Sequence, residues 1–106
     1  MAREIQVAPG EVVIAVYQAD DGAGIFMDGR EILHVDFLQS GRTSFHLAAG
    51  QSADLRFEIY NLTGGNYNGG IVVNAGNRRV YEAHPRGMTP PLWNVAWNDG
   101  FTLIAK

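Results

Sequence analysis

The sequence contains no cysteine, and this absence excludes several classes of protein at once. A chain without cysteine can form neither a disulfide scaffold nor a Cys-ligated zinc site, and it cannot use a catalytic thiol. Its 106 residues are nevertheless enough to bury a hydrophobic core without such a staple. We therefore expect a single domain over residues 1–106 that folds on its own.

Clustered positive charge and long apolar runs are also missing. Eight Lys and Arg residues are scattered along the chain against 11 Asp and Glu, for a formal net charge of -3. A nucleic-acid-binding protein usually gathers its basic residues into a patch or stripe. The longest apolar run, Val12 to Tyr17, is far short of the ~20 residues that span a bilayer. We expect neither nucleic-acid binding nor membrane insertion. No signal peptide is seen, so the location stays open. An extracellular protein would either use a non-classical route of export or have this sequence as its mature form.

Helical periodicity is the third absence. No window places apolar residues at i, i+3, i+4 and i+7 over the length that a helix needs. The dominant period is two, as where Leu55, Phe57 and Ile59 alternate with the polar Asp54 and Arg56. Such alternation predicts strands, here over residues 3–7, 11–18, 24–28, 31–37, 42–47, 53–61, 69–74, 78–82, 92–97 and 101–105.

Turn residues of defined kinds separate these segments. Asp28-Gly29 predicts a tight hairpin, and Asp99-Gly100 predicts a turn between the last two strands. Purely parallel sheets would need helical crossovers, which this sequence lacks. The expected fold is therefore all-β, an antiparallel, jelly-roll-like β-sandwich.

Two segments depart from the alternating pattern. Residues 61–70 include four glycines and three asparagines, a composition that weakens a strand and is typical of a shaped loop. Residues 83–92 include three prolines, which cannot donate ladder hydrogen bonds, so we expect a rigid, exposed loop there. If the protein binds a ligand, these loops are where we expect the contacts.

Asp20 and Asp21 form the most suggestive polar motif. Two adjacent carboxylates at the end of an apolar strand repel each other, so they favour either open solvent or a bound cation. Calcium takes oxygen ligands only and tolerates irregular geometry, so Asp carboxylates and Asn amides suit it. The alternative is that Asp21-Gly22 turns a hairpin and Asp20 is simply solvated.

Aromatic and amide residues nearby suggest a sugar. Pyranose rings pack their C–H faces on aromatic rings, while their hydroxyls hydrogen-bond to amides and carboxylates. Tyr67 lies inside the Gly/Asn-rich segment, which makes it the best stacking candidate. The candidate ligand-binding residues are Thr63, Gly64, Gly65, Asn66, Tyr67 and Asn68. Trp93 and Trp97 share a strand face, which fits either the core or a contact between subunits.

The segment Ala19 to Gly29 resembles the signature hairpin of the protective-antigen-like β-sandwich domain, in which an Asp-Asp pair precedes a short apolar strand and an Asp-Gly turn. The Leu47 to Gly50 turn and the strand ending in Tyr60-Asn61 are similar to later parts of that domain. The resemblance covers about residues 11 to 75.

The resemblance implies a set of calcium ligands. Calcium-dependent flocculins and epithelial adhesins of this family hold the ion with an Asp-Asp pair and a later Asn, which match Asp20, Asp21 and Asn61. Residues 59–70 are more loosely similar to the calcium loop of bacterial galactose-binding jelly-roll lectins. The implied function is calcium-dependent binding of a carbohydrate, with the ion bridging protein carboxylates and sugar hydroxyls.

The sequence allows a second class of function and argues against a third. A non-catalytic assembly module would act through self-association, or by docking on a larger complex through exposed strand edges and the Trp93/Trp97 face. An enzyme is not expected. The chain has no nucleophile elbow or phosphate loop, and His34, His46 and His84 lack metal-ligand spacing.

Overall fold

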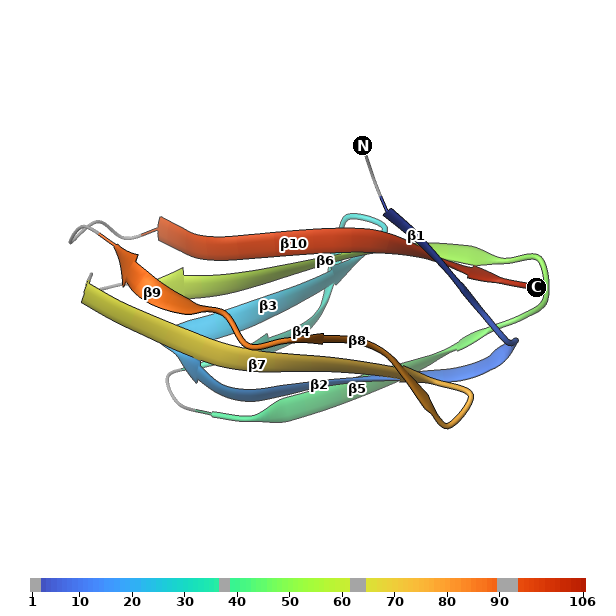
Figure 1. Ribbon diagram of the computed structural model, residues 1–106, viewed down its shortest axis with the longest axis horizontal. Coiled ribbons are helices and arrows are strands. Elements are labelled where there is room, and N and C mark those ends of the chain that lie inside the picture. The colour runs from blue at the N-terminus through green and yellow to red at the C-terminus, as the bar shows by residue number, and fades with distance from the viewer. Residues whose placement is uncertain (1–2, 37–38, 62–64, 90–93) are drawn as a thin grey trace.

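The computed structural model describes residues 3–36, 39–61, 65–89 and 94–106, and these residues form an all-β fold (Figure 1). No helix capable of crossing a membrane occurs within these ranges. The strands are β1 (Arg3–Val7), β2 (Gly10–Asp20), β3 (Gly22–Met27), β4 (Arg30–Val35), β5 (Gly41–Leu47), β6 (Ser52–Asn61), β7 (Gly65–Ala75), β8 (Arg78–Ala83), β9 (Arg86–Thr89) and β10 (Asn94–Ala105).

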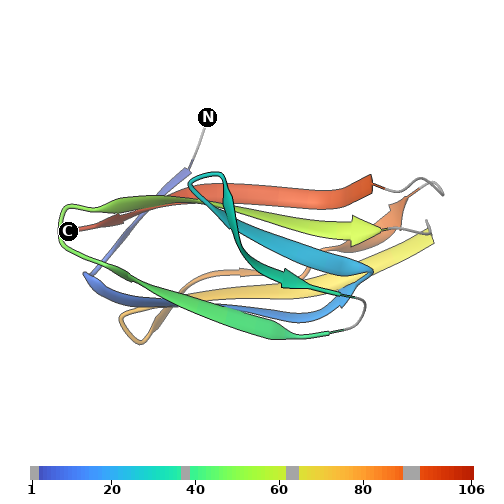
Figure 2. The same cartoon turned by 180° about the vertical axis from the view of Figure 1, so that it is seen from behind.

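The strands make two sheets that pack face to face. The first sheet has the order β1-β10-β6-β3-β4, and the second has the order β5-β2-β7-β8. Strand β9 also belongs to the second sheet, where it pairs with β7. Figure 2 shows the molecule from behind, where β4 of the first sheet runs beside β5 of the second. The fold is thus sandwich-like, as the alternating sequence pattern predicts.

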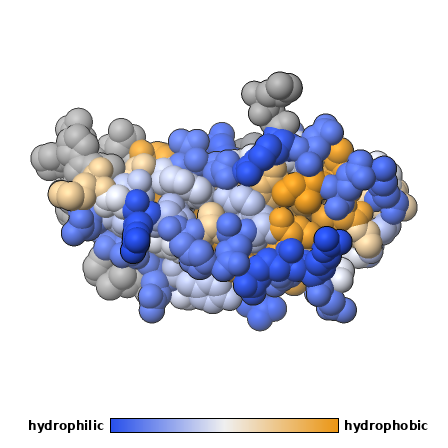
Figure 3. Space-filling model, in the orientation of Figure 1, coloured by the Kyte–Doolittle hydropathy of each residue, from blue (hydrophilic) through white to orange (hydrophobic). Residues whose placement is uncertain are grey.

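The core lies between the two sheets and takes the inward-facing residue of each alternating pair. Ile25, Phe57 and Ile59 of the first sheet and Ile14 and Ile71 of the second are fully buried. Their polar neighbours along the strands point outward, as expected of half-buried strands. On the face seen in Figure 3, apolar surface gathers near β1 and β8, and most of the remaining surface is hydrophilic.

The Asp28-Gly29 hairpin is confirmed. Met27 pairs with Arg30 across it, and Asp28 and Gly29 have φ angles of 52° and 83°. Positive φ at both central residues matches the right-handed twist of the flanking strands, which is why Asp-Gly is favoured in a two-residue turn.

Two expectations about strand pairing are wrong. The sheets are not purely antiparallel, because β1 pairs in parallel with β10. A parallel pair needs a long crossover, and here the whole intervening chain provides it. The predicted Asp99-Gly100 turn is instead internal to β10, which stays paired with β6 from Asp99 to Ile104. A Cβ at Gly100 would lie 2.7 Å from the Leu55 carbonyl oxygen, so this glycine allows a close approach of two strands.

The two predicted loops are also shorter than expected. Strand β7 begins at Gly65, inside the Gly/Asn-rich segment, and residues 86–89 form β9. The two stretches pair with each other, with Tyr67 opposite Gly87 and Asn68 opposite Arg86. Each has a weak strand pattern alone, but their mutual pairing satisfies the backbone groups of both.

Candidate functional site

Asp20 and Asp21 lie where the chain passes from the second sheet to the first. Asp20 is the last residue of β2, and Gly22 begins β3, so Asp21 sits between the two sheets. The peptide bond joining the two aspartates is cis. The Asp21 N–H donates a hydrogen bond of 2.5 Å to the Tyr60 carbonyl, which fixes the acidic pair against the end of β6.

Asn61 follows Tyr60 as the last residue of β6 and is only 1% exposed. It is the one buried polar residue in the described part of the chain. Its Nδ2 donates to the Gly65 carbonyl at 2.9 Å, which orients the amide and ties the end of β6 to the start of β7. The end of β2 and the start of β7 meet as well, since Asp20 pairs with Asn68.

The structure therefore brings Asp20, Asp21 and Asn61 to one end of the molecule, the left-hand end in Figure 1. The described part of the ligand-binding segment predicted from the sequence, Gly65 to Asn68, lies at the same end. Thr63 and Gly64 of that segment lie outside the described residues. Gly65 to Asn68 belong to β7, with Asn66 and Asn68 exposed on its outer face.

Tyr67, which was predicted to stack on a sugar, has a different environment from the one expected of a loop residue. It is partly buried and packs against the hydrophobic core. A Cβ at Gly87 would lie 2.9 Å from the Tyr67 hydroxyl, so the absence of a side chain there leaves room for the ring. Tyr67 is also among the residues that line a surface hollow, together with Asn66, Asn68 and Arg86.

The surroundings of Asp20 disfavour its ionised form. Burial raises the pKa of Asp20, and the side-chain hydrogen bond and negative charge of Asp21 raise that pKa further. A bound cation offsets the repulsion between two adjacent carboxylates and so favours their ionised forms. Carboxylate and amide oxygens are the ligands that calcium prefers, and this end of the molecule carries Asp20, Asp21 and Asn61.

A hollow of about 440 Å³ opens beside Asp21 on the outer face of the first sheet. Tyr60 forms part of its wall and donates from its hydroxyl to Glu58 Oε1 at 3.1 Å. Burial, together with the hydrogen bond and charge of Glu58, raises the pKa of Tyr60 to about 12. The phenol thus stays protonated at neutral pH, and Tyr60 shares this hollow with Asp21.

Sequence reasoning missed the neighbours of Tyr60 in this hollow. His34 lies between two carboxylates, 3.5 Å from Glu31 Oε2 and 3.2 Å from Asp36 Oδ1. The sequence feature connected with this arrangement is Gly24, which leaves room for Tyr60. A Cβ at this position would collide with the Tyr60 hydroxyl. That contact depends on the register between β3 and β6, which the sequence alone does not give.

The two tryptophans differ in how far the structure describes them. Trp97 is partly buried and packs against the core, whereas Trp93 lies outside the described residues. Self-association through a Trp93/Trp97 face therefore stays a prediction. In the ranges that the structure describes, no group of three or more His, Asp or Glu side chains is arranged to hold a metal ion. The candidate calcium site differs from such a group because it combines two carboxylates with an amide.

Comparison with protein-family models, with curated proteins and with solved structures gave no match to this chain.

Proposed function

We propose that the protein binds a carbohydrate through a calcium ion held at the end of the molecule that carries Asp20, Asp21 and Asn61. The observation that carries the proposal is the hydrogen bond from the Asp21 N–H to the Tyr60 carbonyl. It holds the acidic pair beside the strand end that presents Asn61, although 39 intervening positions separate Asp21 from Asn61 in the sequence.

In this proposal Asp20 and Asp21 supply the charged oxygen ligands, and Asn61 supplies a neutral one. When bound, calcium completes its shell of six to eight oxygens with backbone carbonyls, water or sugar hydroxyls. The hollow beside Asp21 has space for a sugar ring, and the Tyr60 ring offers an apolar face for its C–H groups. We also propose a jelly-roll-like topology and kinship with the protective-antigen-like domain, on the sequence resemblance alone.

The test has two steps. Titration calorimetry with calcium chloride on chelator-treated protein should show one site for the wild type. Asp20→Asn and Asp21→Asn should each weaken that site at least roughly tenfold, because each removes a charged ligand. The matched control is Glu4→Gln, which removes an exposed carboxylate from β1. A glycan array run with calcium and with chelator then tests sugar binding. Wild-type protein that takes up no calcium and gives the same array with chelator would exclude the proposal.

A further inference from the structure

The outer face of the second sheet carries a row of four hollows, which we call the furrow. Each hollow shares lining residues with the next. The first two share Val13, Arg42 and Asn74, and the second and third share Tyr17. The third and fourth share Asn68 and Arg86.

The furrow is long. On β7 it extends from Asn74 to Asn66, a distance of eight residue steps along one strand, which is roughly 26 Å at the usual rise per residue. Such a length fits a chain of several sugar rings and not a single small molecule. Its far end lies beside the proposed calcium site, because Asn68 pairs with Asp20.

The lining is rich in planar amides and poor in large apolar side chains. Asn66, Asn68 and Asn74 come from β7, and Gln18 comes from the bulged end of β2. Gly70 also lines the third hollow, and a Cβ there would lie 3.3 Å from the ring of His84. Amide groups both donate and accept hydrogen bonds, so they suit a ligand covered with hydroxyl groups.

Tyr17 stands in the middle of the furrow with half of its surface exposed. Within the described ranges only Tyr17 and Met88 are exposed large hydrophobic residues. A protein partner usually needs a broader apolar patch than these two residues provide. A single exposed aromatic ring among amides is better suited to stacking on a sugar.

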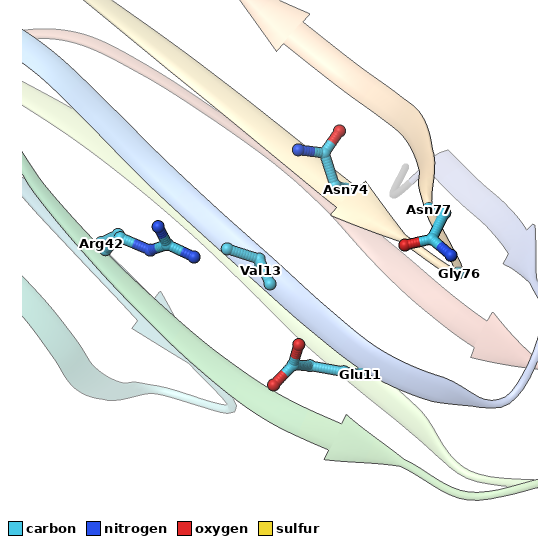
Figure 4. A pocket seen from close by; sticks show the side chains of 6 residues that line it. All are labelled: Glu11, Val13, Arg42, Asn74, Gly76 and Asn77. Atoms are coloured by element: carbon cyan, nitrogen blue, oxygen red, sulfur yellow. The ribbon is translucent and has the colours of Figure 1, made fainter.

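Two arginines give the furrow positive charge. Neither Arg42 nor Arg86 forms an ion pair in the described part of the chain, whereas Arg3, Arg56 and Arg79 do. Glu11 is the single carboxylate among the described lining residues, so two positive charges meet one negative charge. Figure 4 shows Arg42, Glu11 and Asn74 displayed on this face. An excess of positive charge here contrasts with the net charge of -3 of the whole chain.

We propose that this furrow is a second binding site, which takes an extended oligosaccharide bearing carboxylate or sulfate groups. Arg42 and Arg86 pair with the acidic groups, the amides bind hydroxyls, and Tyr17 stacks on a central ring. The site needs no metal ion. It can therefore stand or fall separately from the calcium site.

The test is calorimetry in the presence of chelator with three hexasaccharides. Oligogalacturonate carries carboxylates, a heparin fragment adds sulfates, and maltohexaose is the neutral control. We expect binding to at least one of the two acidic chains and none to maltohexaose. The affinity should fall when sodium chloride is raised from about 0.05 to 0.5 M, because salt screens exposed ion pairs.

Variants locate the site. Arg86→Ala and Tyr17→Ala should each weaken binding at least roughly tenfold, since Tyr17 lines the two middle hollows and Arg86 lines the last two. Arg30→Ala is the matched control, because Arg30 is an exposed arginine on the first sheet with no ion pair in the described chain. Thermal melting confirms that each variant folds. Silence toward both acidic chains, equal binding of the neutral chain, or equal losses in Arg30→Ala and Arg86→Ala would each overturn the proposal.

Discussion

Asp99 connects three strands through one carboxylate. It accepts hydrogen bonds from Arg3 of β1 at 2.6 Å and from the Tyr81 hydroxyl of β8 at 2.7 Å. The Gly100 N–H, beside it in β10, donates a third at 2.8 Å. Burial alone would raise the pKa of Asp99, but these hydrogen bonds and the Arg3 charge lower the pKa overall. The ionised form is therefore the one that stabilises the fold.

The consequence is a specific dependence on pH. A carboxyl group whose pKa is lowered by folding stabilises the protein at pH values above 3.8, which is its pKa in the unfolded chain. This contribution is lost as the pH falls through the pKa that the group has in the folded protein. We expect Asp99→Asn to lower the free energy of unfolding by about 1–2 kcal/mol at pH 7. The difference from wild type should shrink as pH falls below 3.8 and through the folded pKa of Asp99. Urea unfolding at a series of pH values from 7 downward measures this. A difference that stays constant over the whole series would mean that the charge of Asp99 is not involved.

At the scale of elements, β10 depends on the absence of a side chain at Gly100. A Cβ there would lie 2.7 Å from the Leu55 carbonyl oxygen of β6, and a backbone atom in a central strand pair cannot easily move away. We expect Gly100→Ala to destabilise the protein by roughly 1–3 kcal/mol in chemical denaturation. Asn98→Ala, an exposed position of the same strand, is the control and should change stability by less than about 0.5 kcal/mol. Equal stability of the two variants would show that β6 and β10 can separate to admit the methyl group.

The same glycine shows why some elements could be predicted and others could not. Alternation of apolar and polar residues reveals a strand wherever one face is buried, and this located β1, β6 and the β3-β4 hairpin. Asp-Gly, however, is compatible both with a tight turn and with a close approach of two strands. Only the partner strand decides between them. The start of β7 and the whole of β9 were missed for the same reason, since each supplies the hydrogen-bonding partner of the other.

On the scale of the whole molecule, the sequence motifs predict candidate ligand residues but not the surfaces that surround them. Asp20, Asp21 and Asn61 are found at one end because β2, β3 and β6 terminate or begin there, as the proposed calcium site requires. The hollow beside Tyr60 and the furrow on the second sheet could not be predicted, because both depend on the register between strands. The furrow joins residues as distant in sequence as Tyr17 and Arg86.

Calcium should act on the stability of the entire domain. Because the pKa of Asp20 is raised, its ionised form destabilises the metal-free fold, and this penalty disappears as pH falls toward 3.8. Asp20→Asn should therefore raise the stability of the metal-free protein slightly, by ~0.5 kcal/mol, at pH 7. Calcium should stabilise the wild type by about 2.7 kcal/mol at one hundred times its dissociation constant.

These two effects have opposite signs in one variant, which makes them a strict test. Melting curves of wild type and Asp20→Asn, each with calcium and with chelator, measure both. In chelator the variant should melt at a higher temperature than the wild type. When both proteins are given calcium at one hundred times the wild-type dissociation constant, the wild type should melt at the higher temperature. Glu4→Gln should follow the wild type in both conditions, since Glu4 is exposed on β1. If calcium raises the melting temperature of the variant as much as that of the wild type, the ion is bound elsewhere and the acidic pair has another role.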